Sequence, residues 1–113
     1  MSDDCLFCKI VAGSIPADVV ASTDRVLAFR DISPQAPVHV IVIPREHHGD
    51  VSTLAAADAA LLAEVVEVAD VAATELADGQ YRLIFNNGPR AGQSIFHVHA
   101  HVIGGTQLGW TPA

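Results

Sequence analysis

Positive charge is scarce in this chain of 113 residues: six Lys and Arg stand against thirteen Asp and Glu, a formal net charge of −7. This balance repels the phosphate backbone of nucleic acids and the surface of anionic membranes. We therefore expect neither nucleic acid nor membrane among the partners. A small phosphate-containing ligand is still allowed, because a local cluster of backbone N–H groups or imidazoles can outweigh a distant negative field.

Long apolar runs and cysteines are scarce as well. No apolar run approaches the ~20 residues of a membrane-spanning helix, and the acidic residues 3 and 4 stand where a secretory signal would be basic. Cys5 and Cys8 could close only a short disulfide loop. The sequence therefore predicts a reduced, cytoplasmic protein. Residues 1–113 are expected to form a single domain, because so short a chain cannot bury two separate cores.

Turn-forming residues divide the chain into about five strands, one long helix and one short helix, which indicates an α+β fold. The long helix is expected to begin after a Ser52 or Thr53 cap, to carry apolar residues at helical spacing from Leu54 to Leu76, and to end at Gly79. The short helix is expected at 7–12, and the strands at 18–21, 26–29, 38–43, 81–86 and 95–103.

The last strand candidate reads I-F-H-V-H-A-H-V-I. A side-chain period of two places His97, His99 and His101 on one face of such a strand. A lone histidine is more often a structural residue, but three in strict alternation favour a functional site. The opposite, core-facing side is expected to carry Phe96, Val98, Ala100 and Val102.

A metal ion shared by all three histidines is one alternative. In a strand, His97 and His101 would lie ~13 Å apart at ~3.3 Å per residue, too far for two ligands that each sit ~2 Å from one ion. At least one imidazole must therefore have another task, such as nucleophilic attack, proton transfer or orientation. The preceding segment 86–94, N-N-G-P-R-A-G-Q-S, has the polar donors that a phosphate needs, although ordinary hairpin loops look similar.

The motif H-V-H-A-H-V-I resembles the His-x-His-x-His-x-x signature of the histidine triad (HIT) family, in which x is hydrophobic. The resemblance covers nearly the whole chain and is greatest to the nucleoside phosphoramidase (histidine triad nucleotide-binding, Hint-like) branch. It implies a HIT-like, mainly antiparallel sheet and a symmetric homodimer, which would hide part of a composition that is 50% hydrophobic. The other matching motifs are F-C-K-I at 7–10, I-P-A at 15–17, F-R-D-I-S-P-Q-A-P at 29–37, H-V-I-V-I-P at 39–44 and G-Q-S at 92–94.

The resemblance implies catalytic roles for four histidines. His99 would attack the α-phosphorus and carry the nucleotidyl group until water removes it. It would have to be neutral at its reacting nitrogen, with the other ring nitrogen held by a hydrogen bond. His101 would face phosphate oxygens, His97 completes the triad, and His39 would support the triad from a neighbouring strand.

The resemblance also implies nucleotide-binding residues. Asn86, Gln93 and Ser94 would contact the phosphate or the leaving group, and Ser94 could pass a proton to the departing amine. Asp31 would hold the ribose hydroxyls, and Trp110 would reach the site of the partner subunit. The base pocket would include Phe7, Ile10 and Ile32, which without the resemblance read simply as core residues.

Cys5-x-x-Cys8 has metal-ligand spacing, but one such pair is only half a site and could equally be redox-active or two buried thiols. Resemblance to some bacterial HIT proteins implies a structural zinc ion held by Cys5, Cys8, His47 and His97. His48 is the alternative third ligand, because it is adjacent to His47.

The expected reaction is hydrolysis of a purine nucleoside 5′-phosphoramidate to the nucleoside monophosphate and an amine. Dinucleoside polyphosphate hydrolysis is the first alternative, since it would use the same nucleophile and Arg90 could contact a longer polyphosphate. A non-catalytic module that binds zinc and nucleotide is the second. No organic cofactor is expected.

Overall fold

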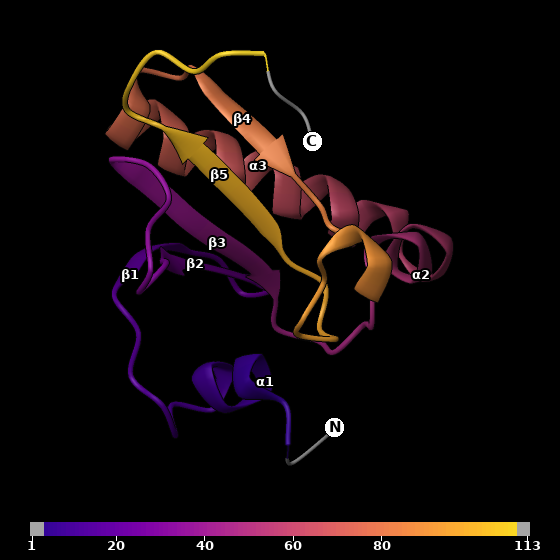
Figure 1. The fold of residues 1–113 in the computed structure, drawn as a ribbon. Helices are drawn as coiled ribbons and strands as arrows, with labels where there is room; N and C mark the ends of the chain where they lie inside the picture. Colours follow the sequence, from indigo (N-terminus) through magenta and orange to yellow (C-terminus); the bar gives the residue numbers. More distant parts are fainter. Residues whose placement is uncertain (1–3, 111–113) are drawn as a thin grey trace.

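The computed structural model describes residues 4–110 and contains one five-stranded sheet (Figure 1). The strands follow the order β1-β2-β3-β5-β4 and every neighbouring pair is antiparallel. This architecture confirms the α+β fold with a mainly antiparallel sheet. Among the described residues, no helix is long and apolar enough to cross a membrane. The elements are α1 (Leu6–Val11), β1 (Val19–Ser22), β2 (Val26–Arg30), β3 (Val38–Pro44), α2 (Val51–Ala57), α3 (Ala59–Ala77), β4 (Tyr81–Ile84), the 3₁₀ turn η1 (Pro89–Ala91) and β5 (Ala100–Gly104).

The two faces of the sheet are covered differently. Figure 1 shows α3 running along the sheet, with α1 set apart from it near β2 and β3. Strand alternation in β3 sends Val38, Val40 and Val42 into a core shared with α3, whereas Ile41 and Ile43 face the other side and pack with α1. The histidines of β3 and β5 share this second face with α1.

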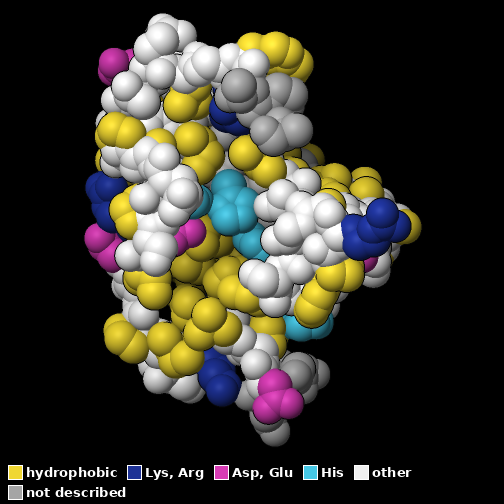
Figure 2. Space-filling model, in the orientation of Figure 1, with side chains coloured by type: hydrophobic (Ala, Val, Ile, Leu, Met, Phe, Trp, Pro, Cys, Tyr) yellow, Lys and Arg dark blue, Asp and Glu magenta, His cyan; other side chains and the backbone are white. Residues whose placement is uncertain are grey.

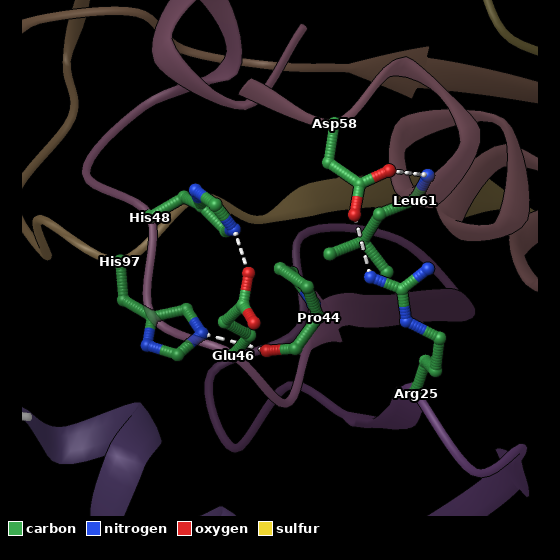
Figure 3. Close-up of polar contacts among 7 residues, drawn as sticks. All are labelled: Arg25, Pro44, Glu46, His48, Asp58, Leu61 and His97. Carbon is green, nitrogen blue, oxygen red and sulfur yellow. Dashed lines mark hydrogen bonds and ion pairs between the residues drawn. The ribbon is translucent and has the colours of Figure 1, made fainter.

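The long helix expected over 54–76 is wrong in one respect: it is two helices, α2 and α3, separated at Asp58. The Asp58 carboxylate accepts a hydrogen bond from the Leu61 N–H at 3.0 Å and one from Arg25 at 2.6 Å, as Figure 3 shows. Asp58 therefore caps a new helix and ties it to the start of β2. The cap of the first helix is Asp50, not Ser52 or Thr53.

The strand expected over 95–103 is also shorter than predicted, because β5 begins at Ala100. In the register of the β3–β5 pair, Val42 lies opposite Ala100, so Pro44 would lie opposite Val98. Pro44 has no N–H to donate, and its carbonyl already accepts from the His97 side chain. Residues 95–99 therefore leave the sheet, and Phe96 is exposed instead of facing the core.

Candidate active site and metal centre

The segment that carries His97 and His99 is held by the end of β3 at Pro44 and by the loop 45–49 that follows it. Because this segment is not paired in the sheet, hydrogen bonds to the loop take the place of a strand partner. Figure 3 shows the first of them, from His97 to the Pro44 carbonyl. The three bonds run from His97 Nε2 to Pro44 O (2.8 Å), from Val98 N to His48 O (2.7 Å) and from Gln93 Nε2 to Gly49 O (2.8 Å).

His99 is oriented by the main chain of His97. Its Nδ1 lies 2.9 Å from the His97 carbonyl oxygen, and a carbonyl can only accept, so Nδ1 carries the hydrogen. In the neutral ring, Nε2 then has a free lone pair. Burial lowers the pKa of His99, whose side chain packs edge-on against Phe7 at a centroid distance of 5.0 Å. The shift favours the neutral ring, whose lone pair is then on Nε2.

His39 and His101 form a second hydrogen-bonded pair. The Gln35 N–H donates to His39 Nδ1 at 3.1 Å, so the hydrogen of a neutral His39 sits on Nε2. This Nε2–H lies 2.9 Å from His101 Nδ1, which must accept. Burial, reinforced by the neighbouring His99 and His39, lowers the pKa of His101 to about 4. A neutral His101 thus presents an N–H at Nε2.

Asp31 lies beside this pair. Its Oδ2 is 3.4 Å from His39 Nε2, and its Oδ1 accepts from the Ser33 N–H at 2.7 Å. Donor atoms of Asp31, His39 and His101 lie within 4.8 Å of one another, close enough for a metal ion. However, an ion at His39 Nε2 would push the hydrogen to Nδ1, where it would face the Gln35 N–H. The arrangement fits a hydrogen-bonded network better than a metal site.

The structure brings Cys5, Cys8, His47 and His97 together, with their ligand atoms within 4.8 Å of one another. His97 Nδ1 lies 3.4 Å from Cys5 Sγ and 3.5 Å from Cys8 Sγ, and His47 Nδ1 lies 3.3 Å from Cys8 Sγ. Because His97 Nε2 donates to the Pro44 carbonyl, the lone pair of Nδ1 faces the sulfurs, as in many metal-binding histidines. The donor set fits tetrahedral zinc.

His48, the alternative third ligand, is turned elsewhere. Its Nε2 lies 2.7 Å from a carboxylate oxygen of Glu46, and Figure 3 shows the two side chains pointing toward each other. The side chain of His47, not that of His48, contacts the cysteine pair.

An apolar cavity of about 280 Å³ opens between α1 and the sheet. In Figure 2, hydrophobic side chains gather beside the histidines on this face. Phe7, Ile10 and Ile32, the three residues expected in a base pocket, all line this cavity, and so does Asp31. One of them, Ile32, is 99% exposed at the rim. Its lining includes Phe7, Ile10, Phe29, Asp31, Ile32 and Ile41.

Gln93 does not present a donor to a ligand. Its side chain is 4% exposed, and both Nε2 hydrogens are used, one by the Gly49 carbonyl at 2.8 Å and one by the Ile95 carbonyl at 3.0 Å. Its Oε1 accepts from the Gly88 N–H at 2.9 Å. In this geometry Gln93 is a brace between two loops, and the contact with phosphate or leaving group expected from the sequence stays a prediction.

The other expected ligand-binding residues are less closely tied to the histidines. Asn86 donates to the Ala91 carbonyl at 2.9 Å, which leaves its second amide hydrogen for another acceptor. Ser94 is exposed and lines a separate cavity beside Cys5 and His47. Trp110 is 86% exposed.

Sequence reasoning missed the main-chain groups that orient the site. The carbonyls of Pro44, His48 and Gly49 and the N–H of Gln35 fix the histidine segment and the His39 ring. Every residue carries such groups, so no residue type marks the ones that are used. The proline at the end of β3 was the one available signal, since it predicts where a ladder stops.

Known proteins are similar to this chain in fold and in sequence. A model described as the HIT domain matches residues 12–108. An uncharacterized HIT-like protein of Synechococcus elongatus is 43% identical over 113 residues, which cover 99% of each chain. A 14 kDa zinc-binding protein of Brassica juncea is 41% identical over 112 residues, covering 96% of this chain and 99% of that protein.

Similarity in three dimensions is equally extensive. The crystal structure of a HIT family hydrolase from Legionella pneumophila has a TM-score of 0.91 and 42% sequence identity, and the alignment covers 97% of this chain and 100% of that one. A domain match over most of the chain, supported by these likenesses along its whole length, establishes that the protein belongs to the HIT family.

Proposed function

We propose that this protein is a nucleotide hydrolase of the Hint-like branch, which cleaves purine nucleoside 5′-phosphoramidates through a nucleotidyl intermediate on His99. The observation that carries this proposal is the hydrogen bond between His99 Nδ1 and the His97 carbonyl, because it leaves the lone pair on Nε2. The name of the Legionella relative, a HIT family hydrolase, supports the reaction class.

The reaction has two displacements. In the first, His99 Nε2 attacks the α-phosphorus, the bond from phosphorus to the amine nitrogen breaks, and the amine leaves with a proton supplied by Ser94. In the second, water attacks the same phosphorus, one of its protons returns to Ser94, and the bond to Nε2 breaks, giving the nucleoside monophosphate and free His99. Dividing one hard displacement into two lowers each barrier.

Charge that develops on the phosphate oxygens is stabilised by aligned donors. His101 supplies the Nε2–H left by its bond with His39. Asn86 has an amide hydrogen to spare. The chain has a net charge of −7, and a carboxylate side chain at this position would repel the phosphate. Neutral N–H donors do not.

The nucleoside occupies the apolar cavity next to α1. Its volume of about 280 Å³ is near the lower end of small-molecule pockets. The base packs among Phe7, Ile10 and Ile32, which gives the fully exposed Ile32 an apolar partner. Asp31, on the wall of the same cavity, accepts hydrogen bonds from the ribose hydroxyls.

Zinc is proposed as a structural ion held by Cys5, Cys8, His47 and His97. The Cys/His cluster and the printed name of the Brassica juncea relative, a zinc-binding protein, both support it. When bound, zinc would fix the first turn of α1 against the segment before β5. His97 would thereby be held in place on both sides, by the ion and by the Pro44 carbonyl.

A symmetric homodimer in the cytoplasm is the proposed working form. β4 lies at one edge of the sheet, and Val66 and Val71 of α3 are exposed at 37% and 52%. An unpaired edge strand and exposed aliphatic side chains are features that a subunit interface covers. Trp110, exposed after β5, is proposed to reach the site of the second subunit.

The test is phosphorus NMR of the purified protein with adenosine 5′-phosphoramidate and, in parallel, a diadenosine polyphosphate. AMP released from the phosphoramidate by the wild type, with His99→Ala inactive, is the expected result. Faster cleavage of the dinucleotide would make the protein a dinucleoside polyphosphate hydrolase. Binding of both compounds without turnover would identify a non-catalytic module.

A further inference from the structure

We infer that Asp31 is a positioning residue for His101, acting through His39, and not only a binding residue for the ribose. The inference rests on the proposed function, because it assigns a further residue to the same site. It is carried by three observations: the placement of the Asp31 carboxylate, the fixed orientation of the His39 ring, and the short contact between His39 and His101.

Asp31 is tied to His39 by both main chain and side chain. Its N–H donates to the His39 carbonyl at 3.0 Å, and its Oδ2 lies 3.4 Å from His39 Nε2. The other carboxylate oxygen accepts from the Ser33 N–H at 2.7 Å, which restrains the orientation of the group. The two side chains are 17% and 5% exposed, so water competes little for these contacts.

The ring of His39 can satisfy its neighbours in only one tautomer. The Gln35 N–H needs a lone pair at Nδ1, while the negative charge of Asp31, 3.4 Å from Nε2, favours a hydrogen there over a lone pair. In the opposite tautomer, the hydrogen on Nδ1 would face the hydrogen of the Gln35 N–H. The lone pair on Nε2 would then face the carboxylate of Asp31. Asp31 therefore favours the form whose Nε2–H also points to His101.

The consequence for His101 follows directly. His39 Nε2 is 2.9 Å from His101 Nδ1, so His101 accepts there and keeps its hydrogen on Nε2, the nitrogen left for a phosphate oxygen. An ionised carboxylate has about four lone-pair sites. Asp31 can thus accept from the ribose and from the Ser33 N–H while its negative charge stays 3.4 Å from His39 Nε2, which links recognition of the sugar to the state of His101.

Asp31→Asn is the decisive variant because it preserves shape. Asn can keep the hydrogen bond from the Ser33 N–H through its one side-chain oxygen, but it places no negative charge beside His39 Nε2. Asp18→Asn is the matched control: Asp18 pairs with Arg30 at 3.4 Å, so it removes a nearby carboxylate from a residue that does not contact the histidines. Circular dichroism and thermal melting check that both variants fold.

The kinetic test compares adenosine 5′-phosphoramidate with its 2′,3′-dideoxy analogue. We expect Asp31→Asn to lower kcat on both substrates by about 10-fold or more, the scale of losses when an outer hydrogen-bonding partner of a functional histidine is removed. Asp18→Asn should leave kcat unchanged on both. A residue that acted only on the ribose would lose its effect on the dideoxy substrate, and that result would overturn the inference.

A spectroscopic test needs no turnover. Nitrogen-15 correlation spectra of the histidine rings distinguish the two neutral tautomers. We expect His101 to carry its hydrogen on Nε2 in the wild type and in Asp18→Asn, and to become a mixture in Asp31→Asn. An unchanged His101 tautomer in Asp31→Asn would refute the inference. Should the wild type cleave neither nucleotide, the proposed function would fail, while these spectra would still decide the role of Asp31.

Discussion

The carbonyl oxygen of His97 lies 2.9 Å from Nδ1 of His99, while the imidazole of the same His97 faces Cys5 and Cys8. One residue therefore joins the proposed nucleophile to the proposed zinc site. Its main chain sets which nitrogen of His99 is free to react, and its side chain is the ligand that a metal ion would immobilise. For this reason, substitutions of Cys5 or Cys8 should change the orientation of His99.

His47 and His48 provide a test of the zinc ligands, because the two histidines are adjacent and only one contacts a cysteine. His47→Asn should lose most of the roughly one zinc ion expected per chain of a four-ligand site. His48→Asn should retain it, since His48 contributes its carbonyl, which the substitution preserves, to the bond with Val98. Metal analysis of both purified variants measures the difference.

Thermal melting adds a second readout for the same pair of variants. A structural zinc contributes directly to folding, so His47→Asn should melt at a lower temperature than His48→Asn. Equal zinc contents in the two variants would reject His47 as the ligand. A wild type that is free of zinc and unaffected by chelators would reject the metal centre itself.

Gln93→Ala is expected to act on stability. The substitution leaves the partly buried carbonyls of Gly49 and Ile95 without this donor. A fully buried polar group left unsatisfied lowers the free energy of unfolding by about 1–3 kcal/mol, so a loss near the lower end of that range is expected. Asn86→Ala, which removes one more exposed bond, should have a smaller effect. Urea unfolding measures both. A Gln93→Ala variant with full stability but weakened nucleotide binding would instead restore the phosphate contact expected from the sequence.

His101 makes stability depend on pH. Burial lowers its pKa to about 4, against about 6.5 in the unfolded chain. Between these values the unfolded chain binds a proton that the folded protein excludes, so the free energy of unfolding should fall as the pH decreases from about 6.5 to about 4. His97 and His99, whose pKa values are also lowered, act in the same direction.

His101→Gln isolates this contribution. Urea unfolding of wild type and variant at several pH values should show a shallower loss of stability in the variant. Identical pH dependence in the two proteins would mean that His101 is not protected from protonation in the folded state.

Much of the fold was predictable because it follows from residue patterns. Alternating apolar residues marked β3, and the histidine spacing correctly separated His97 from His101, which bind different groups of partners. The prediction that Val98, Ala100 and Val102 face the core is confirmed. The same prediction is wrong for Phe96, which precedes the strand and is exposed.

The errors lie where one local signal competed with a longer pattern. Helical periodicity continued across Asp58 and concealed the cap that starts α3. The alternation of apolar and polar residues from Ile95 onward predicted a strand past the point where pairing ends, opposite Pro44. There the His97 side chain binds the Pro44 carbonyl, which a continuing strand would have used. The role of Gln93 could not be predicted, since its partners are main-chain groups brought together only by the fold.

The central claim is that Nε2 of His99 forms a covalent bond with the nucleotide. The most direct measurement is intact-protein mass spectrometry after rapid quenching of the wild type and of His99→Ala with adenosine 5′-phosphoramidate. We predict a transient nucleotidyl adduct on the wild type, mapped to His99, and none on the variant. An adduct on His99→Ala, or turnover by that variant at the wild-type rate, would contradict the account.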